Sequence, residues 1–399
     1  MLTKLQIILI VVMAFLFLST LGNYFDLKRF GIHFFPLGIM FKTDFFNRVL
    51  EKMGEKGKRF WAFTYNVGKI LALIIAIGFF AYFLVNPFLI LFGSPAGLGI
   101  QLIIPGITVD FKMALLLIIP FLLMIVPHEI AHAVMAKREG IKIKSSGIII
   151  LLIFFGAFVE LMKESLEAAS SRKRIRVLMN GSALNAIFAL LFLGLYLLSP
   201  YIISIGYGES SGVLITNTFD DFPAEGAGIV NGDIIQSIGK TNKSMQIDYK
   251  ETRNVNDFTM IILDSLNSSI LYIMLLDGRN ISLVPTKVDP ITKTNSTTKI
   301  FLGISIYNYL PPKANWLSKM FPYYWNIEIL YIVNLSVAAV FFNLLPLAIT
   351  DGDKIIQEYL KMKNKNGLKH KRILNIMRLF SLALIVLNLV LSAFKFRWL

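Results

Sequence analysis

Two histidines and a glutamate, His128, Glu129 and His132, stand at a spacing that suits metal chemistry. On a helix, positions i and i+4 share one face, so both imidazoles can bind one ion with Glu129 beside it. The alternative is a polar turn at a helix end, with both histidines hydrogen-bonded to water. Because the residues from Ala114 to Pro127 that precede the motif are all apolar, the motif lies deep in a hydrophobic segment. Ionisable groups at that depth are costly and normally functional, so the pattern predicts a metal site.

A catalytic zinc site uses three protein ligands and keeps one position open for water. The chain has no cysteine, which leaves His, Asp and Glu as ligands. The best third ligand is Asp351, which follows an apolar segment on the same predicted side of the membrane as His128. Asp353 is the fallback ligand, and Thr350–Asp353 also suits a helix cap.

The composition places these residues in a membrane protein. Of the 399 residues, 55% are hydrophobic and only 16% are charged, whereas soluble domains carry about a quarter of their residues as charge. These values exclude a soluble enzyme and a disordered chain, and the absence of cysteine excludes a disulfide-stapled secreted scaffold. The net charge is +15, and the basic residues lie mainly in short loops between apolar runs. This distribution is typical of a protein oriented in a lipid bilayer, and we expect no nucleic-acid partner.

Six apolar runs are long enough to cross a bilayer. Loops that alternate between basic and Lys/Arg-free composition assign the sides: 23–67, 137–176 and 354–372 are basic and predicted to be cytoplasmic, whereas 93–111 is predicted to lie outside. The first run has no convincing cleavage site after it and is interpreted as an anchor. The predicted spans are 5–22, 68–92, 113–136, 175–199, 326–349 and 375–394.

Residues 146–162 are apolar but short for a span, and basic clusters flank them on both sides. A spanning helix here would place Arg172–Arg176 outside and change the side of every later loop. The run therefore predicts a re-entrant element, which protein or a water-filled cavity must cover, with a short buried helix as the alternative. Between 206 and 310 the chain becomes polar, with short β-rich runs, which predicts a small extracytoplasmic domain.

Together, HEIAH inside a span and NLLPLAITDGD downstream resemble the site-2 protease family of intramembrane zinc metalloproteases. GAFVE (156–160) is similar to that family's re-entrant β-hairpin, and NGSALN (180–185) to its G-P-x-x-N motif, with Ser182 in place of proline. The insert, with GVLITNTFDDFPAEGAGIVNGDIIQSIGK from Gly212, resembles a PDZ domain. The resemblance covers about residues 112–360.

The resemblance implies one Zn²⁺ held by His128, His132 and Asp351, with Glu129 as the general base. It also nominates Asn343 and Asn185 for the oxyanion or substrate alignment, although interhelical hydrogen bonding is the simpler alternative for both. We expect the re-entrant strand to pair with an unwound substrate. We expect the PDZ-like insert to bind a substrate C-terminus by strand addition or to act as a size filter, with a structural spacer as the alternative. The residues expected for these two pairings are Gly156, Ala157 and Phe158, and Gly212, Val213, Leu214 and Ile215.

The expected fold is a polytopic α-helical membrane protein with about six transmembrane helices, a re-entrant β-element and an inserted PDZ-like extracytoplasmic domain. The expected activity is zinc-dependent cleavage of transmembrane protein substrates, with the active site toward the cytoplasm. A scaffold or chaperone without turnover and a metal transporter are the alternatives. The expected regions are 1–111 (N-terminal helices and a cytoplasmic amphipathic loop), 112–205 (first part of the catalytic core), 206–310 (PDZ-like domain) and 311–399 (second part of the core and the last helix).

Overall fold

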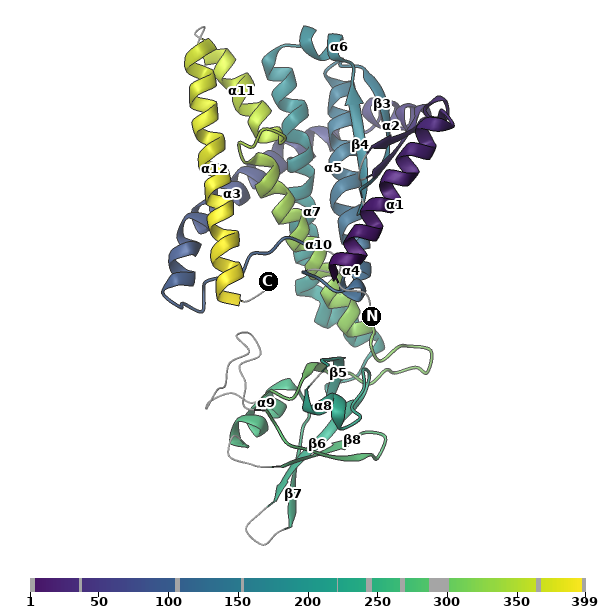
Figure 1. The fold of residues 1–399 in the computed structure, drawn as a ribbon, viewed down its shortest axis with the longest axis vertical. Coiled ribbons are helices and arrows are strands. Elements are labelled where there is room, and N and C mark those ends of the chain that lie inside the picture. Colours follow the sequence, from purple (N-terminus) through teal and green to yellow (C-terminus); the bar gives the residue numbers. More distant parts are fainter. Residues whose placement is uncertain are drawn as a thin grey trace. The chain divides into compact units, whose positions relative to one another are not determined.

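The computed structural model divides into two compact units, residues 1–194 with 328–399, and residues 195–327 (Figure 1). The first carries most of the membrane-helix residues, and the second contains the whole polar insert, 206–310. The boundaries fall within two long helices, so helix ends belong to the second unit. The structure describes residues 4–35, 38–104, 108–151, 154–220, 222–241, 246–265, 270–286, 301–363 and 367–396.

Five of the six predicted spans are confirmed as helices long and apolar enough to cross a membrane: Lys58–Leu91, Lys112–Arg138, Ser171–Gly206, Phe321–Leu344 and Lys369–Phe396. The first run lies in helix α1 (Lys4–Tyr24), where the stretch that qualifies among the described residues, Val12–Gly22, is shorter than a span. Its crossing of the membrane stays a prediction. Besides α1, the helices that lie wholly or mostly in the first unit are α2 (Asp44–Glu55), α3 (Lys58–Leu91), α4 (Phe111–Leu116), α5 (Ile118–Arg138), α6 (Lys163–Ala168), α7 (Ser171–Gly206), α10 (Phe321–Leu344), α11 (Asp351–Lys363) and α12 (Gly367–Phe396).

Small residues let α3 and α7 approach closely. A Cβ on Gly68 would overlap the carbonyl oxygen of Ala183, and Ala72, one turn further along α3, is fully buried. Because lipid tails are as apolar as leucine, helices in a membrane associate through this close backbone packing. The α3–α7 contact therefore fixes the helix that carries Asn185 and Gly181.

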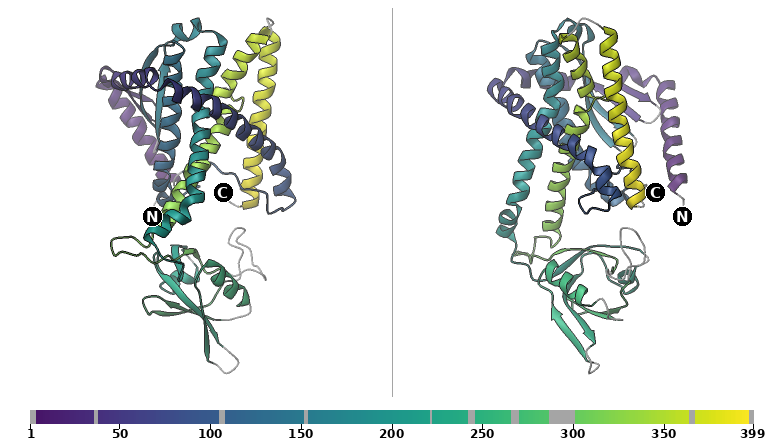
Figure 2. Two further views of the ribbon diagram at one scale, coloured as in Figure 1. Left: turned by 180° about the vertical axis from the view of Figure 1, so that it is seen from behind. Right: turned by 90° about the vertical axis from the view of Figure 1, so that its left-hand side faces the viewer.

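In place of a helix, residues 146–151 and 154–161 lie in two paired antiparallel strands, β3 (Ile143–Leu151) and β4 (Phe154–Leu161), here called the hairpin. The structure therefore agrees with the predicted β-element. The hairpin is half of a four-stranded antiparallel sheet in the order β1–β2–β3–β4. In Figure 2 this sheet lies between α1, which contacts β1, and α5, which contacts β4.

The cytoplasmic loop expected to be amphipathic, residues 24–66, forms elements that its composition alone does not specify. It contains a short 3-10 turn (Leu27–Phe30) and then β1 (Ile32–Phe35) and β2 (Gly38–Thr43). β2 pairs along β3 from Gly38 opposite Leu151 to Thr43 opposite Ser146. Helix α2 follows these strands and packs against α5.

The second unit holds a six-stranded sheet in the order β10–β5–β6–β8–β9, with β7 also paired to β6. Its core is formed by alternate inward residues, such as Leu271, Ile273 and Leu275 of one strand, against Phe258 and Ile262 of α9. The β-rich character of the insert is therefore confirmed, whereas its assignment as a PDZ domain stays a prediction. The elements are β5 (Val213–Thr218), α8 (Pro223–Gly226), β6 (Ile234–Thr241), β7 (Ile247–Glu251), α9 (Val255–Asp264), β8 (Leu271–Leu275), β9 (Asn280–Leu283) and β10 (Ile304–Asn308).

The pairing of β5 contradicts strand addition at Gly212–Ile215. Val213 and Leu214 face Ile235 and Ile234 of β6 on one edge. On the other edge, Val213–Ile215 pair with β10. A peptide that adds to a sheet needs an unpaired edge, and β5 offers none at these residues.

Candidate metal centre and active site

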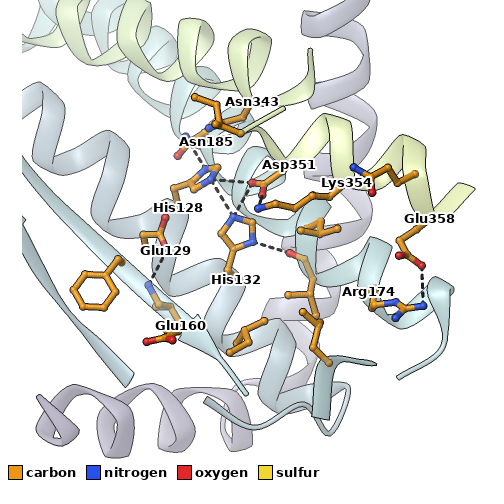
Figure 3. Close-up of a pocket in the computed structure, with 18 of the residues that line it drawn as sticks. His128, Glu129, His132, Glu160, Arg174, Asn185, Asn343, Asp351, Lys354 and Glu358 are labelled. Carbon is orange, nitrogen blue, oxygen red and sulfur yellow. Dashed lines mark hydrogen bonds and ion pairs between the residues drawn. The ribbon is translucent and has the colours of Figure 1, made fainter. Parts of the chain in front are cut away.

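Three side chains from two separate helices converge at one point, as Figure 3 shows. Nε2 of His132 lies 3.0 Å from Nε2 of His128 and 3.0 Å from Oδ2 of Asp351. Nε2 of His128 lies 3.5 Å from the same oxygen. Ligand atoms on a tetrahedron around zinc, each about 2.0–2.1 Å from the ion, are about 3.3 Å apart. The triangle therefore has the size of one face of a zinc tetrahedron.

Local structure explains how these residues meet. The histidines lie on the buried face of α5, one turn apart, and each is less than a tenth exposed. Asp351 is the first residue of α11, directly after a turn in which the Thr350 hydroxyl donates to the carbonyls of Leu345 and Leu347. This turn reverses the chain after α10 and brings the carboxylate to the imidazoles.

Helix α7 closes the third side of the site through Gly181. A Cβ at this position would stand 2.5 Å from Nε2 of His132 and 2.7 Å from Nε2 of His128. Any larger residue would displace these two nitrogens. The sequence resemblance included Gly181 in a motif, but this close approach was not predicted.

The hydrogen bond of His132 Nδ1 fixes which of its two ring nitrogens carries the hydrogen. Nδ1 of His132 lies 2.8 Å from the carbonyl oxygen of Val177. A carbonyl oxygen only accepts, so Nδ1 carries the hydrogen and the lone pair of Nε2 is left for a metal. No sequence signal points to Val177, because any residue supplies the same carbonyl.

Asn185 contacts His128 directly, a role that the sequence analysis missed. Its Nδ2 lies 3.2 Å from Nδ1 of His128, while its Oδ1 is buried without a hydrogen-bond partner. Rotating the amide by half a turn would place Oδ1 against the Nδ1–H that a metal-bound His128 carries. The same rotation gives the orphaned oxygen a partner, so the geometry fits a metal on Nε2 of His128.

The base candidate Glu129 lines the same cavity, which measures about 790 Å³. Its Oε2 accepts a hydrogen bond from the backbone N–H of Val159 in β4, at 3.1 Å. Asn343 of α10 also lines the cavity, and its amide has no hydrogen-bond partner among the described residues. The structure thus brings the predicted metal ligands, the base, both asparagines and Phe158 to one cavity, whereas Gly212–Ile215 belong to the second unit.

The fallback ligand, Asp353, faces away from the histidines. Its carboxylate accepts two hydrogen bonds from Arg378 of α12 and one from Gln357. It is therefore not a ligand in this arrangement.

Charged residues that the sequence analysis did not single out line the rest of the cavity. Arg174 Nη2 lies 2.9 Å from Glu358, which also accepts from Lys361. Burial alone would raise the pKa of Glu358, but hydrogen bonds from Lys361 and Ser171 and the charge of Arg174 lower it overall. The carboxylate stays ionised, so this part of the cavity is polar and suited to water.

Comparisons with known proteins agree with the site. The family model described as Peptidase family M50 matches residues 116–388, which include both histidines and Asp351. An uncharacterized protein of Methanocaldococcus jannaschii, MJ0971, is 28% identical over 269 residues, which are 62% of this chain and 64% of that protein. The match thus spans slightly less than two thirds of the relative.

Proposed function

Because the chain belongs to peptidase family M50, we propose that it is a zinc-dependent endopeptidase that cleaves peptide bonds within or near transmembrane helices. The observation that supports this most directly is the triangle of His128, His132 and Asp351 in a cavity that also contains Glu129. A cavity among the five candidate spans can hold both water and an unwound peptide segment, and it shields them from lipid.

The chain's own residues divide the work of hydrolysis. Zinc, when bound by the three ligands, supplies Lewis acidity that activates water and polarises the scissile carbonyl. Glu129 would take a proton from the attacking water and pass it to the leaving amine. Asn343, whose amide is free among the described residues, would donate to the carbonyl oxygen as it becomes negative. Asn185 would orient His128.

The substrate would reach the site as an extended strand, because a helix hides its peptide bonds in i→i−4 hydrogen bonds. The edge of β4 opposite to β3 carries no strand among the described residues. Since the N–H of Val159 points out from this edge, the strand period of two makes the N–H and C=O of Ala157 and Phe155 point out too. Gly156 and Phe158 direct theirs to β3, so of the three expected pairing residues only Ala157 is placed to bind a substrate strand.

The charges of the loops support one orientation in the membrane. The basic loops around 137–176 and 354–372 flank the helix ends nearest the metal ligands. We therefore place the active site toward the cytoplasm and the second unit outside, in a multi-pass protein of the cell membrane.

A substrate C-terminus is the partner that we propose for the second unit. With both edges of β5 taken, the outer edge of β10 is the place for strand addition, because no described strand pairs with it. Helix α9 lies beside β10, and Val255 donates to Asn308 at the end of that strand. A strand edge next to a helix offers backbone pairing together with a side-chain groove. A domain that only limits the size of substrates would bind no such peptide.

The decisive experiment compares Glu129→Gln with the wild-type protein in liposomes that contain a transmembrane substrate. If the protein is a protease, the Glu129→Gln variant keeps one zinc per chain, and its cleavage rate falls about 10²–10⁴-fold because the general base is removed. Glu164→Gln, at an exposed position of α6, serves as the control.

Two outcomes would contradict the proposal. A wild-type protein without zinc-dependent cleavage, whose biological effect survives Glu129→Gln, is a scaffold. A wild-type protein that moves zinc across the bilayer, with a flux altered by the variant, is a transporter.

A further inference from the structure

The last helix, α12, makes a buried ion pair with the segment that carries the metal ligand. Nε and Nη2 of Arg378 lie 2.7 and 2.6 Å from the two oxygens of Asp353. The Asp353 side chain is fully buried, whereas that of Arg378 is 31% exposed. This bidentate geometry is the strong form of an arginine–carboxylate pair, and it fixes orientation as well as distance.

The pair acts on the metal ligand over a very short distance. Asp351 and Asp353 both lie in the first turn of α11, separated only by Gly352. A Cβ on Gly352 would overlap the backbone of Leu344, so this turn sits directly on the end of α10. Movement of Asp353 must therefore move Asp351 relative to the imidazoles on α5.

Helix α12 is a firm support for such a contact. Asn388 accepts from the fully buried Asn86 of α3 and donates to the carbonyls of Phe83 and Leu384. Ser392 accepts from the backbone of Ile100. Polar contacts of this kind join helices within a bilayer, so Arg378 is anchored to the helix bundle and not only to α11.

We infer that Arg378 is a positioning residue that holds Asp351 in its metal-binding place through Asp353. The inference rests on the proposed metal site, and it assigns to α12 a part in that site. It differs from a purely structural ion pair, because a structural pair would affect folding stability without changing the metal's surroundings.

The test measures metal binding in the full-length protein in detergent, with Arg378→Lys, Arg378→Ala and the exposed control Arg372→Ala. Lysine keeps the charge but loses the bidentate fork. We expect Arg378→Ala to weaken zinc affinity about 10- to 100-fold, as for other groups that orient a ligand. Arg378→Lys should fall between it and the wild type, and Arg372→Ala should match the wild type.

A spectroscopic readout separates positioning from stability. The visible absorption of the Co²⁺-substituted protein reports the geometry of the ligands, so it should change in Arg378→Lys even if Arg378→Ala does not fold. If Arg378→Lys shows wild-type zinc affinity and an unchanged Co²⁺ spectrum, the inference is wrong although the metal site stands. If the wild-type protein binds neither metal at His128, His132 and Asp351, the proposed function itself fails.

Discussion

The backbone N–H of Val159 donates to the carboxylate of Glu129, so the edge of the β4 strand touches the proposed general base directly. A substrate strand laid along this edge would run past the base and toward the metal ligands. Binding and chemistry would then share one element, since the strand that aligns the peptide also sets the position of the carboxylate. This relationship gives the hairpin a role that its apolar composition alone does not reveal.

The first prediction concerns the outward backbone of Ala157. Proline is tolerated on a strand edge whose N–H faces away from the sheet, and it removes that donor. We expect Ala157→Pro to lower kcat/KM by several-fold to about tenfold, the value of one hydrogen bond, with unchanged zinc content. Ala157→Val, which keeps the N–H, is the control. Equal turnover by the two variants would show that the substrate does not pair with this edge.

The second prediction concerns the close approach of α7 to the histidines. Gly181→Ala would place a methyl group against Nε2 of both His128 and His132, the nitrogens that we propose bind the metal. Zinc measured by atomic absorption after dialysis should fall well below one ion per chain, and cleavage should fall with it. Gly194→Ala, on the same helix with nothing within 4 Å of the new Cβ, should bind normally. Full metal content in Gly181→Ala would mean that the site is arranged differently.

The third prediction separates two roles of Asn185. If its oxygen accepts from Nδ1–H of His128, Asn185→Asp keeps that acceptor and should retain zinc, whereas Asn185→Leu should weaken zinc affinity about 10- to 100-fold. If Asn185 served the oxyanion instead, both variants would bind zinc like the wild type and lose cleavage. Competitive titration with a chelator, run beside a cleavage assay, distinguishes these results.

The fourth prediction concerns the pH dependence of stability. Hydrogen bonds from Lys144, Ser145 and Lys42 lower the pKa of Glu160 from 4.5 to about 2 and tie β4 to β2 and β3. A carboxyl whose folded pKa is lowered stabilises the fold above its unfolded pKa and loses this contribution as the pH falls through its folded pKa.

In metal-free protein, the thermal midpoint of the wild type should therefore exceed that of Glu160→Gln at pH 6. The difference should shrink between about pH 4.5 and about pH 2. The exposed Glu209→Gln is the control. A difference that stays constant over this range would show that Glu160 does not act through its charge.

The features that could be predicted from the sequence are those set by neighbouring or regularly spaced residues. Runs of apolar residues located five helices of spanning length, and the i, i+4 spacing placed His128 and His132 on one face. Asp351 was predicted as the third ligand because it follows an apolar segment on the same predicted side, and the structure brings its carboxylate to both imidazoles. The short run at 146–162, with Gly156 within it, favoured a β-element over a span, and the structure forms one.

The remaining features depend on contacts between distant segments. Strands β1 and β2 exist because they pair with β3, and nothing in 32–43 alone distinguishes them from an amphipathic loop. The occupied edge of β5 follows from β10, which comes much later in the chain. Likewise, Asp353 was a possible ligand from the sequence, because the sequence does not show that Arg378, on another helix, binds its carboxylate.

The division of the proposed metal ligands between α5 and α11 would also set the order in which the site is completed during synthesis. Both histidines are synthesised long before the aspartate, because the whole second unit lies between them in the chain. Two imidazoles alone make an incomplete zinc site. Under the proposed function, the nascent polypeptide would therefore enter the bilayer inactive and could cut neighbouring membrane proteins only after α11 has been synthesised.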